Sequence, residues 1–176
     1  GSQIVGGLQM IAARNANPLR SVVVSVTQFH AGTTHNIIPE EAFLTGTVRS
    51  LDEAVRDLAE SRIRQIAEGI AAAHDAKVDV DYERACPVTV NHADETLHAA
   101  RAAIDIVGEK NVNTDVDASM AGEDFAFMLQ ARPGAYIMIG NGETAALHNP
   151  AYDFNDEAIA YGMSYWVKLA EQRLTD

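Results

Sequence analysis

The stretch SVVVSVTQFHAGTTHNIIPEEAFLTGTVRS, residues 21–50, decides how the first half of the chain folds. Its beginning alternates apolar valines with polar residues and is rich in β-branched side chains, which favour strands. Its end alternates in the same way, with Leu44 and Val48 on one face and Arg49 on the other. The polar residues 30–41 separate the two parts. The stretch therefore predicts two antiparallel strands, residues 21–29 and 42–50, with one buried face.

Helical periodicity flanks this hairpin on both sides. Residues 3–18 place apolar side chains three and four positions apart, and the proline at the end of the stretch prevents the helix from continuing. After the hairpin, Ser50 and Glu53 have the spacing of a capping box, in which the serine oxygen caps the helix and the glutamate reaches back. A second helix is therefore expected from there to about His74.

The segment KVDVDYERACPVTV, residues 77–90, alternates again and predicts a third strand, which Pro87 ends or confines to a sheet edge. The resulting order is helix, strand, strand, helix, strand. This is the order of a ferredoxin-like βαββαβ unit that lacks its first strand.

From about Asn91 the pattern becomes that of a mainly parallel α/β sheet. The uninterrupted apolar run AYIMIG, residues 135–140, predicts a strand covered on both faces. Such a strand needs neighbours, which must come from residues outside this chain or from another copy. Helices are expected after about Asn91, with Leu97, Ile104 and Val107 on one face, at residues 123–132, and after Asn155, which caps the last one.

Composition narrows the classes of function. With 176 residues, of which 47% are hydrophobic, the chain can form one domain or two small ones with a proper core. A net charge of -12 without a Lys/Arg cluster argues against binding to nucleic acid or to an anionic membrane surface. Cys86 is the only cysteine, and no apolar run is long enough to span a bilayer, so a cytoplasmic location is expected.

His148 is the first candidate functional residue. A neutral imidazole on a loop is a good metal ligand, and Asp153 and Asp156 lie near enough in sequence to fix its tautomer. A zinc site needs three or four ligands, however, and a lone histidine is more often a surface or packing residue. The spacing leaves both interpretations open.

Two further places could carry chemistry. Glu123 and Asp124 follow a glycine at a predicted helix start, where carboxylates either cap the helix or, for Glu123, face a cleft while Phe125 packs. Asn36 lies in a loop of hydrogen-bonding side chains, and Arg49 on the polar sheet face could bind a carboxylate with two parallel N–H donors. A solvated strand arginine is the plainer alternative.

Three motifs, in a fixed order along the chain, resemble those of a known protein family. The run SVTQFHAGTTHNIIPEEAFLTGTVRS, then AGEDFAFMLQARPGAYIMIGNG, then LHNPAYDFNDEAIAYG resembles the dinuclear-metal amidohydrolases typified by hippurate hydrolase, N-acyl-amino-acid amidohydrolase and auxin-conjugate hydrolases. The similarity covers essentially the whole chain.

The resemblance implies a fold and a domain organisation. Residues 1–90 would be a ferredoxin-like lid and dimerisation domain without its first strand. Residues 91–176 would be the C-terminal part of an α/β catalytic domain. The chain would then be the C-terminal portion of an enzyme that acts as a homodimer.

The resemblance also implies a reaction and a site. Two divalent ions, zinc, manganese, cobalt or nickel, would activate a water that cleaves the amide of a small N-acylated amino acid. His148 matches a metal ligand, and Asn36, Arg49 and Glu123 match residues near the substrate. The family's Cys-Gly-His-Asp-x-His stretch and its Glu-Glu pair, which include the general base, have no counterpart here. The isolated chain is therefore expected to be inactive and to hold no metal stably; the alternative is a non-catalytic oligomerisation or ligand-binding module.

Overall fold

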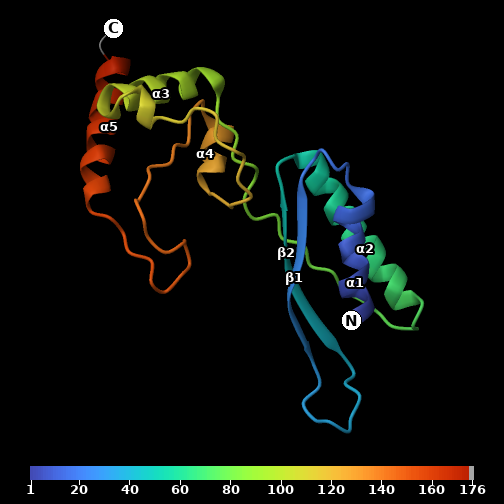
Figure 1. Cartoon of the computed structure of the whole chain (residues 1–176). Helices are drawn as coiled ribbons and strands as arrows, with labels where there is room; N and C mark the ends of the chain where they lie inside the picture. Colours follow the sequence, from blue (N-terminus) through green and yellow to red (C-terminus); the bar gives the residue numbers. More distant parts are fainter. Residues whose placement is uncertain (175–176) are drawn as a thin grey trace. The chain divides into compact units, whose positions relative to one another are not determined.

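The computed structural model describes residues 1–174. The chain folds as two compact units, drawn in Figure 1, and each is described by itself. The first unit comprises residues 1–88 and 118–123, and the second comprises residues 89–117 and 124–176. These units are defined by contacts between residues, whereas the predicted domains, 1–90 and 91–176, are defined by resemblance to a family. The predicted domain boundary remains a prediction.

The first unit has the helix, strand, strand, helix order that the sequence predicts. Its elements are α1 Ser2–Met10, continued by the π-helical turn η1 Ile11–Asn15, then β1 Val22–Ala31, β2 Ala42–Ser50 and α2 Glu53–Ala72. The two strands pair antiparallel, as expected from the alternation. Helices α1 and α2 pack side by side and against the hairpin (Figure 1).

The hairpin register has one irregularity. Val26 pairs with Gly46 and Gln28 pairs with Thr45, so Thr27 is an extra residue that forms a β-bulge. Gly46 is needed opposite the bulge, because a Cβ atom there would lie 2.4 Å from the Ser25 carbonyl oxygen.

One face of the hairpin contributes to a small core. Val24 is buried together with Leu8 and Ile11, and Ala59 of α2 closes the cluster. Gly7 lets the helices approach, since a Cβ atom at this position would lie 2.9 Å from side-chain atoms of α2. The opposite face, which carries Arg49, is left open.

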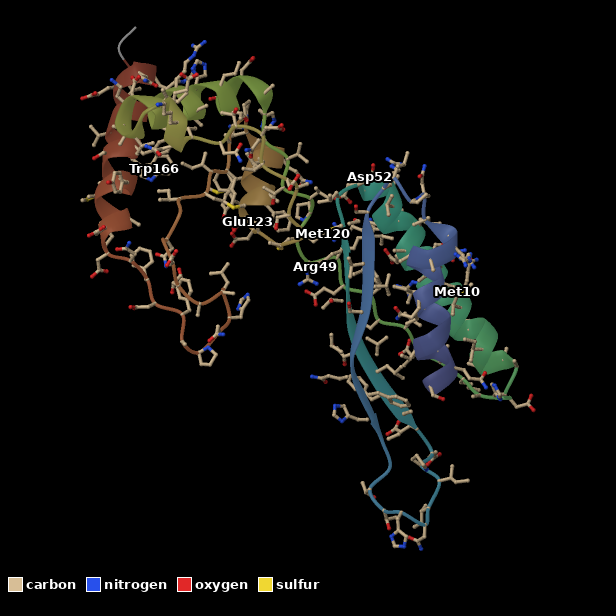
Figure 2. The ribbon with its side chains drawn as sticks, viewed as in Figure 1. Met10, Arg49, Asp52, Met120, Glu123 and Trp166 are labelled. Carbon is tan, nitrogen blue, oxygen red and sulfur yellow. The ribbon has the colours of Figure 1, made fainter. Side chains whose placement is uncertain are left out.

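The start of α2 corrects the capping-box prediction. Asp52, not Ser50, is the N-cap residue, and its carboxylate accepts hydrogen bonds from the amides of Ala54 and Val55 at 2.8 and 3.2 Å. The Ser50 hydroxyl donates to the Asp52 carbonyl instead. Asp52, labelled in Figure 2, also pairs with Arg20, which helps to hold the carboxylate at the helix end. The helix ends at Ala72, close to the predicted end.

The predicted third strand at residues 77–90 is not formed. The segment is extended along α2 and is held by side chains: Arg64 donates to the Val80 carbonyl at 2.6 Å, and Arg84 pairs with Asp57 and Glu60. A strand needs a neighbour with free backbone groups. Within residues 1–174 the only paired strands are β1 and β2, and neither pairs with this segment.

The second unit is helical. It contains α3 Ala93–Val107, the 3₁₀ turn η2 Glu109–Asn111, α4 Phe125–Ala131 and α5 Glu157–Leu174. Its helices lie where the sequence predicts them, and Asn155 caps the start of α5 by accepting from the Glu157 amide at 3.0 Å. The core is formed by Ala99 and Ala102 of α3 against Tyr165 of α5.

The predicted buried strand at residues 135–140 is also wrong for this chain. The segment is assigned no strand, and its Met138 is 74% exposed. No strand is found in the second unit within residues 1–174, so the run has no ladder to join. Helix α5 also exposes an apolar side chain, since Trp166 is 66% exposed (Figure 2).

Within residues 1–174, no helix is both long and apolar enough to cross a membrane.

Candidate functional site

His148 lies on a tight turn in a strained backbone conformation. The Asn149 amide donates to the Ala146 carbonyl at 3.1 Å, which closes a turn with Leu147 and His148 at its centre. His148 has a φ of 66°, the value that position i+2 of a type II turn requires and that glycine usually supplies. Such strain at a non-glycine residue persists only when the surroundings enforce it, and it is typical of functional positions.

Side chains close the loop that carries this turn, residues 141–155. The Asn141 side chain donates to the Asp153 carbonyl and accepts from the Asn155 amide, both at 2.8 Å. The Thr144 hydroxyl donates to the same Asp153 carbonyl and accepts from the Asp153 amide, both at 3.1 Å. The loop is orange in Figure 1 and leads directly into α5.

The imidazole itself is exposed and is not packed among apolar side chains. Asp153 and Asp156, which could have fixed its tautomer, form no hydrogen bond with it that the structure of residues 1–174 records. The backbone of Asp153 is instead bound by Asn141 and Thr144. The ring is therefore accessible to a metal ion.

Arg49 lies on the open face of the hairpin. It pairs across the strands with Val23, beside the Ser25–Thr47 pair, and its side chain is exposed (Figure 2). No ion pair of Arg49 is found in the described part of the chain. Its guanidinium is thus available to an anionic group.

Asn36 lies in the loop at the tip of the same hairpin, where its side-chain oxygen accepts from the Thr34 hydroxyl at 2.9 Å. Arg49 is seven residues beyond Ala42, where β2 begins. At the usual rise of a strand that is about 23 Å, and the tip loop extends farther still. Asn36 and Arg49 of one chain therefore cannot contact the same small molecule.

Glu123 and Asp124 differ in their surroundings. Glu123 is half-buried and belongs to the first unit. Asp124 is the N-cap residue of α4, yet its carboxylate forms no capping hydrogen bond. Phe125 packs on Tyr136, with ring centroids 5.7 Å apart, as the functional interpretation of this motif expects.

Asn36, Arg49 and Glu123 belong to the first unit, and His148 belongs to the second. Among residues 1–174, no three His, Cys, Asp or Glu side chains are grouped so that they could hold a metal ion. His148 could supply a single ligand, which does not suffice for a stable zinc site. The described residues thus do not fit a two-metal centre by themselves.

Asn141 and Thr144 were missed by sequence reasoning. Their signal is weak: an asparagine between Gly140 and Gly142 in a turn-rich segment is typical of ordinary loops. Their bonding partners lie nine to fourteen residues away along the chain, which a local pattern does not reveal.

A helix-flanked hairpin followed by a helical unit with an exposed loop histidine defines a mixed α/β protein that carries part of a candidate metal site. The solved structure of the YXEP protein from Bacillus subtilis, described as a dinuclear metal binding peptidase, has this fold. It matches with a TM-score of 0.79 and 32% identity over 99% of this chain and 45% of that chain.

The chain belongs to the peptidase family M20/M25/M40, whose profile matches residues 5–172. This confirms the family resemblance drawn from the three motifs. Hippurate hydrolase of Campylobacter jejuni is 38% identical over 169 residues, which are 96% of this chain and 44% of that protein. N-acetylcysteine deacetylase of Bacillus subtilis is 34% identical over 168 residues, 96% of this chain and 43% of that protein. The chain thus spans less than half of the length of these relatives.

Proposed function

We propose that the chain is part of a metal-dependent amidohydrolase that cleaves the amide bond of small N-acylated amino acids. Membership of the M20 family supports this proposal, as do two relatives whose names give an N-acylated amino acid as substrate. The observation that carries it is the exposed His148 on its strained turn, at the position that matches a metal ligand of the family.

His148 would be one ligand of a centre that binds two divalent ions, zinc, manganese, cobalt or nickel. The remaining ligands and the general base would lie outside residues 1–174, because the described residues contain no further group that could hold a metal. The chain alone is therefore proposed to be inactive and to retain no metal.

Arg49 would bind the free carboxylate of the substrate. Its guanidinium lies on an open sheet face, and its planar donors match a carboxylate in geometry. Asn36 would bind the substrate amide, and Glu123 would lie near the substrate. A carboxylate bound by a bidentate arginine contributes mainly to substrate binding, so loss of Arg49 should raise KM more than it lowers kcat.

The protein would act as a homodimer through its first unit. The separation between Asn36 and Arg49 favours this arrangement, since residues at the two ends of the hairpin can share a substrate only if they come from different copies. The tip of the hairpin also exposes Ile37 and Ile38, the latter by 94%, and a partner surface would cover them.

A hybrid enzyme tests the proposal. The matching part of Campylobacter jejuni hippurate hydrolase is replaced by this chain, and the product, called the hybrid enzyme below, is assayed with hippurate. We expect hydrolysis that Arg49→Ala weakens through KM. Arg101→Ala, which removes an exposed arginine of α3, serves as the matched control. A folded hybrid that binds metal but does not hydrolyse any N-acyl amino acid would contradict the proposed substrate class.

The second candidate is a non-catalytic oligomerisation or ligand-binding module. One observation favours it for the chain on its own: within residues 1–174 no metal-binding group is assembled. Light scattering together with metal analysis separates the two candidates. A dimer that retains no zinc but completes the site in the hybrid enzyme supports the hydrolase, whereas a dimer whose hybrid also stays metal-free supports the module.

A further inference from the structure

We propose that Asn141 is a positioning residue for His148: its side chain joins the two ends of the loop 141–155 and thereby keeps His148 in its left-handed turn. This inference rests on the proposed function in one respect: the proposed role as a metal ligand is the reason for holding His148 in place. The loop geometry on which it is built does not depend on a metal.

The backbone at His148 is strained. A β-carbon makes a φ near 66° sparsely populated, so a free loop would relax toward other conformations. Near the turn, the hydrogen bond from Asn149 to Ala146 opposes this relaxation, and Asn149 also accepts from the Ala151 and Tyr152 amides. The turn is also on the surface, where packing adds little.

The restraint comes from the ends of the loop. Asn141 uses both ends of its amide, since Nδ2 donates to the Asp153 carbonyl and Oδ1 accepts from the Asn155 amide. Thr144 adds two more hydrogen bonds to Asp153. Loop ends that are tied together leave the intervening residues few backbone conformations, and a compact loop of this kind can enforce one strained residue.

Asn155 connects this restraint to the helix. While its amide donates to Asn141, its side chain caps α5 by accepting from Glu157. The loop that presents the imidazole is thus anchored to a helix whose Tyr165 is buried in the core of the second unit. A ligand held in this way needs less ordering when a metal ion arrives.

The chain offers a matched control in Asn91. Its side chain also donates to and accepts from one stretch of backbone, at Tyr136, in the same unit but away from the His148 loop. Asn141→Ala and Asn91→Ala therefore remove the same kind and number of hydrogen bonds. Only the first should act on His148.

Nuclear magnetic resonance of the labelled chain provides the test. A positive φ brings the amide proton close to the Hα of the same residue, so unmodified His148 should show a strong intraresidue Overhauser effect. In Asn141→Ala this effect should fall to the level of ordinary loop residues. The Asp153 amide, whose own acceptor Thr144 is unchanged, should exchange about tenfold faster.

Two results would overturn the proposal. If the strong intraresidue Overhauser effect at His148 persists in Asn141→Ala, the turn is fixed by its own residues. If this Overhauser effect is lost equally in Asn91→Ala, the unit has loosened as a whole. If Asn141→Ala does not fold, Asn141→Asp replaces it, since the carboxylate can still accept from the Asn155 amide but no longer donates to the Asp153 carbonyl. An unchanged His148 signal in that variant counts equally against the proposal.

Metal analysis of the hybrid enzyme separates this inference from the proposed function. If Asn141→Ala releases the His148 turn and also lowers metal content, both stand. If the turn is released but His148→Ala leaves metal content unchanged, Asn141 still positions the loop and the ligand assignment fails.

Discussion

The side chain of Asn91 forms two hydrogen bonds with the backbone of Tyr136, donating to its carbonyl at 2.9 Å and accepting from its amide at 2.8 Å. These are the two groups that a neighbouring strand would bind. One residue on, the His92 amide donates to the Gly134 carbonyl at 3.0 Å. The start of the apolar run 135–140 is thus hydrogen-bonded to the residues that precede α3 in the sequence, and no sheet is involved.

Asn91→Ala should therefore destabilise the second unit. Two net hydrogen bonds of about 0.5–1.5 kcal/mol each predict a loss of about 1–3 kcal/mol. Urea unfolding followed by the fluorescence of Trp166, the only tryptophan, reports on this unit. Asn113→Ala, which removes one local turn bond to the Asp115 amide, is the control and should change little. Equal unfolding midpoints for all three proteins would contradict the role given to Asn91.

Substitution by alanine should have opposite effects on stability at Gly46, opposite the β-bulge, and at Gly69 in α2. Gly46→Ala should cost about 1–3 kcal/mol, because the new methyl group overlaps the Ser25 carbonyl and must push the strands apart. Gly69→Ala in α2 meets nothing within 4 Å and should stabilise by about 0.5–1 kcal/mol through its helix propensity. Calorimetric melting of the two variants checks the sign, and a Gly46→Ala protein as stable as the parent would show that the register is wrong.

Acid should weaken the attachment of residues 77–88 to α2. The hydrogen bond from Arg84, together with Arg64, holds the pKa of Glu60 below its ordinary value of 4.5. A carboxylate whose pKa is lowered by folding stabilises the protein above the unfolded value and loses this contribution as pH falls through the folded value. Glu60→Gln should thus be less stable than the parent at neutral pH, and the difference should vanish as the pH falls below 4.5.

The matched variant for this experiment is Glu68→Gln on the same helix, for which no ion pair is found within residues 1–174. It should be about as stable as the parent in chemical unfolding at neutral pH. High salt should also reduce the Glu60 effect, because the pair is exposed to solvent. Stability should be compared from about pH 3 to about pH 7, a range that includes the ordinary pKa of a glutamate side chain. A stability difference between Glu60→Gln and the parent that stays constant over this range would exclude the ion pair as its cause.

His148→Gly should raise stability. Glycine adopts a positive φ freely, so the substitution should stabilise by about 0.5–1 kcal/mol, less the entropy that glycine adds to the unfolded chain. His148→Ala keeps the β-carbon and should give no gain. Combined with Asn141→Ala, the glycine should recover part of the lost stability, because the two residues are coupled through the loop. Thermal unfolding of the parent, His148→Gly, Asn141→Ala and the double variant measures this coupling, and strictly additive changes would argue against it.

The sequence predicts best where structure is decided locally. The valines of β1, the apolar spacing of α2 and the Asn155 cap all follow from side chains within a few residues, and they are confirmed. Residues 77–90 and 135–140 carry equally clear strand patterns but form no strand, because pairing requires a partner that no local pattern supplies.

The candidate site divides in the same way. His148 and Arg49 are recognisable by residue type and motif, and both are exposed as their proposed roles require. The strain at His148 and its support by Asn141 depend on hydrogen bonds across the loop, which appear only in three dimensions. The ion pair between the helix cap Asp52 and Arg20, 32 residues earlier in the chain, likewise appears only in three dimensions.

The metal content of the hybrid enzyme tests the central claim most directly. The account predicts about two divalent ions per subunit, as a two-metal site requires, and a lower content together with lost turnover in His148→Ala. His74→Ala, which removes an exposed histidine bound to Gln3, should leave both unchanged. A His148→Ala hybrid that keeps its full metal content and activity would contradict the assignment of His148 as a ligand.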